Sequence, residues 1–140
     1  MVCIYCGHST NVINSRPQKR THQTWRRRAC TNCGAIFTTH EVVELESSVV
    51  VRHIDGRLDA FRRDKLLISI YKAMGHREKP IDDAGALAAT ITSKLLDLSK
   101  TAAIEAADIS KVTFQVLKRF DDAAAVQYAA YHRKSLSTSS

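Results

Sequence analysis

The sequence predicts an α+β protein with a small β-rich N-terminal module and a body formed by a β-hairpin sheet and about four helices. Two observations predict it. All four cysteines lie within the first 33 residues, and apolar residues recur with helical spacing only beyond residue 62. A chain of 140 residues suits one ordinary domain or two small ones. We place the module in residues 1–44, the body in 45–134 and a flexible tail in 135–140.

The cysteines form two Cys-x-x-Cys pairs separated by 23 residues: Cys3, Cys6, Cys30 and Cys33. This spacing is typical of tetrahedral zinc ligation by four thiolates, and a chain without an export signal is not expected to form disulfides. Gly7 and Gly34 follow the pairs and permit tight turns. With short strands between the pairs, near residues 12–13 and 36–37, the module reads as a zinc ribbon.

Four protein ligands complete the coordination sphere, so the zinc is expected to be structural and not catalytic. Forty residues bury too little apolar surface to fold unaided, and the metal must supply much of the stability. A histidine ligand would have to displace a cysteine from a complete set, so we expect the three nearby histidines at the surface: His8, His22 and His40.

Basic residues are concentrated in the module. Residues 1–40 contain six Lys or Arg and no acidic residue, whereas residues 41–140 contain 15 basic and 14 acidic residues. This predicts a polyanion-binding surface made of Arg16, Lys19, Arg20, Arg26, Arg27 and Arg28. Double-stranded DNA is the first expected partner. RNA is second because few aromatic side chains accompany the charge, and a basic surface for solubility or for an acidic protein is the remaining alternative.

Strand alternation sends Arg26 and Arg28 to one face of this segment and Arg27 with Trp25 to the other. In the body, β-branched residues predict strands near 42–46, 48–54 and 57–61, with Asp55-Gly56 as a two-residue hairpin turn.

Periodicity predicts helices over 63–74, 82–99, 108–120 and 121–134, beginning near Asp82, Asp108 and Asp121-Asp122. Their expected buried faces include Leu67, Ile70, Tyr71 and Met74 in the first helix, Leu98 in the second, Phe120 in the third, and Tyr128 and Tyr131 in the fourth.

The sequence lacks the motifs of several common nucleotide-binding and catalytic sites. The chain has neither a G-x-x-x-x-G-K-[ST] phosphate loop nor a G-x-G-x-x-G turn, and no catalytic Ser/His/Asp set is recognisable. Asp82 and Asp83 are explained by a helix start, where carboxylates complement the dipole. The sequence contains no stretch of about 18 uncharged apolar residues, the length that a membrane-spanning helix needs. We therefore expect a soluble, cytoplasmic protein that is not an enzyme.

Three segments resemble the NrdR-type bacterial transcriptional repressors: CIYCGHSTNVINSR, RRRACTNCGAIFTTHEVVEL and VVRHIDGRLDAFRRDKLLISIYKA. The resemblance covers residues 1 to about 134. It implies that a DNA-binding zinc ribbon is joined to an ATP-cone domain and that the protein represses ribonucleotide reductase genes. Zn²⁺ would be held by the four cysteines, and Arg16 with Arg26–Arg28 would belong to the DNA-binding face.

The resemblance further implies that the protein senses ATP and dATP and that Mg²⁺ can accompany the nucleotide. Nucleotide binding would change the homo-oligomeric state of the protein, which would act at the bacterial nucleoid. The nucleotide would contact Val51, Arg52, His53, Asp59 and Lys65. His53 and Ile54 stand where the family usually has lysine and arginine. Arg52 or Arg57 could compensate for these changes. Arg52 would do so only with a local change of register, because neighbouring strand residues face opposite sides.

The chain also departs from the family pattern in the ribbon, at Ile4, Asn14, Trp25 and Ile36, and in its last helix. Two alternatives follow. The first is a structural zinc-ribbon nucleic-acid-binding protein without nucleotide sensing, which the changes at His53 and Ile54 favour. The second is a regulatory piece of a ribonucleotide reductase, because those enzymes also carry ATP cones.

Overall fold

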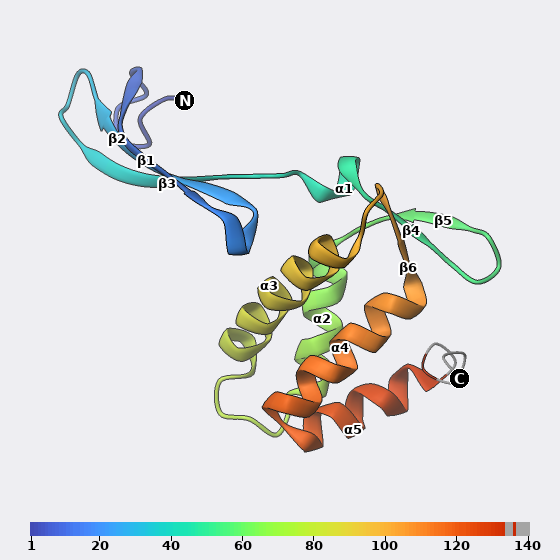
Figure 1. The fold of residues 1–140 in the computed structure, drawn as a ribbon. Coiled ribbons are helices and arrows are strands. Elements are labelled where there is room, and N and C mark those ends of the chain that lie inside the picture. Colours follow the sequence, from blue (N-terminus) through green and yellow to red (C-terminus); the bar gives the residue numbers. More distant parts are fainter. Residues whose placement is uncertain (134–135, 137–140) are drawn as a thin grey trace. The chain divides into compact units, whose positions relative to one another are not determined.

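The computed structural model describes residues 1–133 and 136, and the chain forms two compact units, residues 1–43 and 44–140 (Figure 1). The predicted flexible tail, 135–140, lies outside the described residues except for Leu136. No helix in the described part of the chain has the length and apolar character needed to cross a membrane.

The first unit is a three-stranded antiparallel sheet in the order β1-β2-β3. Its elements are β1 (Thr10–Gln18), the 3-10 helix η1 (Lys19–Thr21), β2 (Gln23–Cys30) and β3 (Ile36–Val42). Gly7 and Gly34 end the two cysteine turns with φ angles of 74° and 71°, which glycine adopts without strain. Within residues 1–43, all of which are described, only Cys3 and Cys30 are buried. The sheet therefore has no apolar core of its own.

The second unit combines a small mixed sheet with helices, which confirms the α+β class. Its elements are α1 (Leu45–Ser48), β4 (Val50–Arg52), β5 (Leu58–Ala60), α2 (Arg63–Ala73), α3 (Pro80–Leu98), β6 (Ala103–Glu105), α4 (Ala106–Phe120) and α5 (Asp122–Tyr131). The strand order is β5-β4-β6, with β4 antiparallel to β5 and parallel to β6.

The strand predicted near 42–46 is wrong. Strand β3 ends at Val42, and α1 begins at Leu45 because the Glu44 carboxylate accepts a hydrogen bond from the Ser47 N–H at 3.2 Å. The sequence also gave no sign of β6. Three residues are too few to show alternation, and their partner β4 lies about fifty positions earlier in the chain.

The Asp55-Gly56 turn differs from the two-residue form that was predicted. The His53 N–H donates to the Arg57 carbonyl at 2.9 Å, and the Gly56 N–H donates to the His53 carbonyl at 2.9 Å. This leaves a three-residue loop, in which Gly56 takes the left-handed conformation at φ 83°. Strands β4 and β5 are correspondingly shorter than the predicted 48–54 and 57–61.

Of the four predicted helix starts, those of α2 at Arg63 and of α5 at Asp121-Asp122 are confirmed, and those of α3 and α4 are wrong. Asp121 caps α5 and accepts from the Ala124 N–H at 3.0 Å. Helix α3 instead begins at Pro80, whose fixed φ suits the first helical position, and this leaves Asp82 inside the first turn. Helix α4 begins at Ala106, so Asp108 also lies in the first turn and does not cap the helix.

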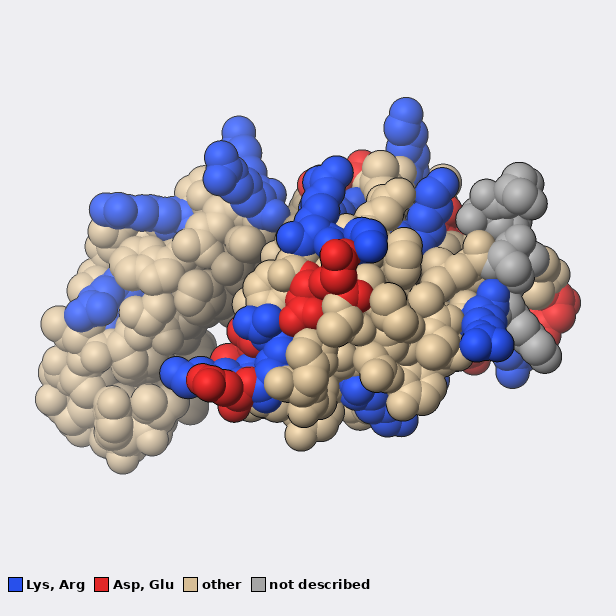
Figure 2. Space-filling view, turned by 90° about the horizontal axis from the view of Figure 1, so that it is seen from below, with Lys and Arg blue, Asp and Glu red and all other residues tan. Residues whose placement is uncertain are grey.

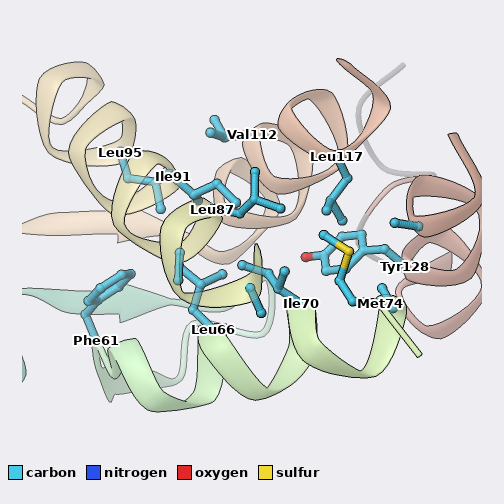
Figure 3. Close-up of a cluster of buried hydrophobic side chains, with 14 of the residues drawn as sticks. Phe61, Leu66, Ile70, Met74, Leu87, Ile91, Leu95, Val112, Leu117 and Tyr128 are labelled. Carbon is cyan, nitrogen blue, oxygen red and sulfur yellow. The ribbon is translucent and has the colours of Figure 1, made fainter. Parts of the chain in front are cut away.

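The core of the second unit lies where α2, α3, α4 and α5 meet (Figure 3). The core includes Ile70, Ile91 and Leu117, each of which is 0% exposed. The buried face of α2 is rotated from the predicted one, because Leu66 is buried in place of Leu67, and Tyr71 is 45% exposed. Leu98, Phe120 and Tyr131 were also predicted inward but are 67%, 44% and 66% exposed.

Candidate functional site

The four cysteines converge at one end of the ribbon sheet. All four sulfur atoms lie within 4.8 Å of one another. The Cys3 and Cys33 sulfurs are 3.7 Å apart, and those of Cys6 and Cys30 are 3.4 Å apart. Four sulfurs at about 2.3 Å from one zinc ion would be separated by about 3.8 Å. The donor set and its spacing therefore fit a tetrahedral Zn²⁺.

Backbone amides further stabilise negative charge on these sulfurs. The N–H groups of Asn32 and Cys33 donate to the Cys30 sulfur, and the Tyr5 N–H donates to Cys3, each at 3.4 Å. A hydrogen bond from the His8 backbone lowers the pKa of Cys6 to about 5. The His8 ring lies near the Cys6 carbonyl at 3.1 Å, and no histidine belongs to the cluster found among the described residues.

The six predicted DNA-binding residues are divided between the turn and the two faces of the ribbon sheet. Lys19 and Arg20 lie in η1 and are exposed. Basic side chains project from this unit into solvent (Figure 2). The strand register pairs Trp25 with Arg16 and Arg27 with Asn14, which places Arg16, Trp25 and Arg27 on one face. Arg26 and Arg28 lie on the opposite face, as alternation predicted.

The second unit contains a cavity of about 270 Å³, bounded by strands β4 and β5 and by the N-terminal ends of α2 and α4. Apolar side chains, among them Val51, Phe61 and Tyr128, form part of its wall. Of the five residues predicted to contact nucleotide, four line this cavity: Val51, His53, Asp59 and Lys65. An apolar wall with a few polar groups is the usual composition of a small-molecule site.

Arg52 is not among the described residues that line this cavity. Its side chain lies on the other face of β4 and donates to the Glu105 carboxylate at 2.9 Å. Ile54 is 89% exposed in the hairpin loop. His53 does reach the cavity, where its Nε2 lies 2.8 Å from an Asp59 carboxylate oxygen. This hydrogen bond lowers the pKa of Asp59, which is therefore ionised at neutral pH.

Sequence reasoning missed several polar residues of the cavity, including Ser69, Ser110 and His132. Ser69 and His132 are hydrogen-bonded at 3.2 Å, and the His132 ring stacks on Tyr128 at 4.1 Å. A second hollow of about 640 Å³ shares Lys65, Ser69 and His132 with the first. The available signal was Lys65-x-x-x-Ser69-x-x-Lys72, a spacing that puts three polar residues on one face of α2.

The chain is similar to known proteins over nearly its whole length. Residues 1–41 match the family model described as "Transcriptional repressor NrdR-like, N-terminal domain". The protein named transcriptional repressor NrdR in Symbiobacterium thermophilum is 35% identical over 134 residues, covering 96% of this chain and 88% of the relative.

Proteins of the same name in Chlamydia felis and Sphingopyxis alaskensis are 34% and 36% identical. The first alignment covers 96% of this chain and 87% of the relative, and the second covers 95% and 85%. These relatives are named as repressors and not as enzymes. The chain, with its four-cysteine zinc ribbon, therefore belongs to the NrdR family of transcriptional repressors.

Proposed function

We propose that this protein is a zinc-dependent, ATP- and dATP-responsive repressor that binds operator DNA upstream of ribonucleotide reductase genes. Residues 1–44 would bind DNA, and residues 45–134 would bind nucleotide and mediate oligomerisation. The observation that supports nucleotide sensing is the cavity, which is lined by His53, Asp59 and Lys65 together with apolar side chains.

The cavity has separate features for the two ends of an adenine nucleotide. Val51, Phe61 and Tyr128 offer apolar surface for a base. Lys65 supplies a cationic group for phosphate, and the first turns of α2 and α4 border the cavity, where helix dipoles favour anions. Asp59 is ionised and cannot face a phosphate favourably. Its carboxylate would instead accept a hydrogen bond from the ribose hydroxyl or the adenine amino group.

Ligand binding in this unit would control the oligomer and, through it, operator binding. A ligand shifts such an equilibrium only when it binds the two states with different affinity. The cavity is bounded by β5, α2 and α4, so occupancy would bias how these elements pack. Mg²⁺ would accompany the nucleotide phosphates.

Titration calorimetry of the zinc-loaded protein with ATP and with dATP tests the sensing half. We expect binding of both, a loss of roughly tenfold or more in affinity for Lys65→Ala, and a weaker interaction for His53→Ala. Ile54→Ala is the matched control, because Ile54 follows His53 in sequence but is 89% exposed. If neither nucleotide binds, the chain is a structural zinc-ribbon protein without nucleotide sensing.

The proposed operator binding is tested by a mobility-shift assay with promoter DNA of the organism's ribonucleotide reductase genes and with a random duplex of equal length. ATP, dATP and their mixture should change the affinity for promoter DNA, and light scattering of the same samples should show a change of oligomeric mass. Equal affinity for both duplexes under every nucleotide condition would rule out operator binding.

A further inference from the structure

The two faces of the ribbon sheet differ in charge and in the freedom of their arginines. The register defines an Arg27 face, made of Asn14, Arg16, Trp25, Arg27, Thr38 and His40, and an Arg26 face, made of Ser15, Arg26, Arg28, Phe37, Thr39 and Glu41. Glu41 is the single acidic residue in residues 1–43. The Arg27 face consequently has no carboxylate.

Arginines on the Arg26 face are engaged within the sheet. Arg26 makes an ion pair with Glu41 of β3 at 3.1 Å, and its side chain is 31% exposed. Its Nε is buried and has no hydrogen-bond partner among the described residues, so it cannot reach a ligand in this conformation. The Arg28 Nε donates to the Thr39 hydroxyl at 3.1 Å. Both side chains therefore lie against β3.

On the Arg27 face the arginines are presented to solvent. Arg27 is exposed, and its cross-strand neighbours Asn14 and Thr38 are short, polar and exposed as well. The Arg16 guanidinium lies over the Trp25 ring, 5.9 Å from its centroid. A cation over an indole face keeps its charge available while losing some side-chain freedom. Trp25 thus holds Arg16 beside Arg27.

We propose that the ribbon contacts duplex DNA with its Arg27 face, and that Arg26 is a positioning residue that joins β2 to β3. Arg27 would contact base edges, and Arg16, held by Trp25, would contact phosphate. This assignment rests on the proposed function and narrows it, because only part of the basic cluster would touch DNA.

Sheet geometry supports one face acting alone. A sheet that lies against DNA presents side chains from one of its faces, and alternate residues of a strand point away from each other. Arg16 and Arg27 are diagonal neighbours across β1 and β2, roughly 7–8 Å apart at their backbones. They can therefore act on the same short stretch of duplex, whereas Arg26 and Arg28 cannot join them without turning the sheet over.

The test compares charge-conserving changes of adjacent residues, Arg27→Lys and Arg26→Lys, in the full zinc-loaded chain. Lysine keeps the charge but loses the forked donor geometry that reads guanine. Affinities for promoter DNA and for a random duplex are measured under identical nucleotide and salt conditions. We expect Arg27→Lys to reduce the preference for promoter DNA by roughly 5- to 100-fold, and Arg26→Lys to keep it within about twofold.

Alanine variants extend the comparison to affinity. Arg16→Ala and Arg27→Ala should weaken binding to either duplex more than Arg28→Ala, and Arg16→Ala should reduce the log–log salt slope by about 0.9. Zinc content is measured for each variant, and Arg26→Lys replaces Arg26→Ala because it retains the pair with Glu41.

Two results would overturn the assignment: a loss of promoter preference in Arg26→Lys equal to that in Arg27→Lys, or a larger loss of affinity in Arg28→Ala than in Arg16→Ala and Arg27→Ala. If the wild-type protein shows no promoter preference, operator binding fails as a function. The alanine series on random duplex then still decides which face meets DNA.

Discussion

Asp121 shows how one carboxylate can join three segments of the helical unit. It caps α5 through the Ala124 N–H at 3.0 Å, and its other contacts are His76 at 2.9 Å and Arg77 at 2.8 Å. Arg77 also binds Asp83 of α3 at 2.5 Å and lies over the Phe120 ring. The turn between α2 and α3 is thereby tied to the turn between α4 and α5.

Replacing Asp121 with alanine should destabilise the protein, because it removes a helix cap and leaves Arg77 with one partner fewer. We expect thermal unfolding, followed by circular dichroism, to shift down by roughly 5 °C or more. Asp122→Ala is the matched control: Asp122 is 76% exposed and its pair with Lys118 lies on the surface, so the shift should be about 1–2 °C at most. Equal shifts would show that the Asp121 contacts do not contribute.

The effect of Asp121 should also depend on pH. The Ala124 N–H, and after it His76 and Arg77, lower the pKa of Asp121 below its usual value. A lowered pKa means that the unfolded chain binds the proton more readily, so the stabilisation is present above a pH of about 4 and is lost as pH falls towards the folded pKa. The difference in melting temperature between wild type and Asp121→Ala should therefore shrink as pH falls below about 4. A difference that grew between pH 4 and pH 2 would contradict this sign.

At the scale of residues, the sequence predicts the chemical role of a side chain better than it predicts which distant residue that side chain contacts. Cys-x-x-Cys spacing is set by the local geometry of a turn, and Gly7 and Gly34 support it within the same segment. Arg52 was the opposite case: its partner Glu105 lies 53 positions away, and nothing near Arg52 reveals it. His132 likewise reaches the cavity only because α5 packs against α2.

At the scale of elements, the second unit depends on the buried face of α2. Ile70 is fully buried among residues of α3, α4 and α5, whereas Ile68, two positions earlier on the same helix, is 52% exposed. Ile70→Ala should lower the free energy of unfolding by about 2–5 kcal/mol, because it leaves a cavity in a packed core. Ile68→Ala should lower it by about 1 kcal/mol or less.

Urea unfolding of the zinc-loaded variants, monitored by far-ultraviolet circular dichroism, gives both values. The two substitutions have the same chemistry and change helix propensity by the same amount, so their difference isolates burial. A loss for Ile68→Ala as large as that for Ile70→Ala would mean that the exposed face of α2 is covered by another surface.

The helices were predicted nearly to their ends, but the exact buried face of α2 was not. Leu66 and Leu67 are adjacent and equally apolar, so periodicity alone cannot decide which one faces the core. Short elements failed for a different reason. Helix α1 and strand β6 have four and three residues, and each depends on a contact that its own composition does not specify.

At the scale of the whole molecule, the two units are stabilised by different means. The apolar core is drawn entirely from Leu45 to Tyr128, while the described residues 1–43 bury only two cysteines. A strong chelator should therefore unfold the ribbon and leave the helices folded, because about 10–16 kcal/mol of zinc binding is lost from one unit alone. Circular dichroism at 222 nm should change little, whereas Trp25 fluorescence should shift. Loss of the helical signal together with the zinc would show that the units do not fold independently.

The charge distribution gives the whole-molecule prediction for DNA binding. If all six basic residues of the first unit neutralised phosphates, the slope of log affinity against log salt would be about −5. Arg26 is paired with Glu41, and Arg28 lies on the same face, so the Arg27 face together with the η1 turn offers four charges: Arg16, Lys19, Arg20 and Arg27. On a random duplex Arg27 lacks its cognate bases and would contact phosphate like the other three, so four contacts give a slope of about −3.5 per ribbon.

Binding of the full chain to random duplex, measured by fluorescence anisotropy between 50 and 300 mM salt, distinguishes the two values. Glu41→Gln provides the internal check. It releases Arg26 from its ion pair, so a slope that stays near −3.5 in this variant places Arg26 away from the phosphates even when it is unpaired. A slope near −5 in the wild-type protein would instead mean that both faces of the sheet reach the duplex, and that the ion pair with Glu41 opens on binding.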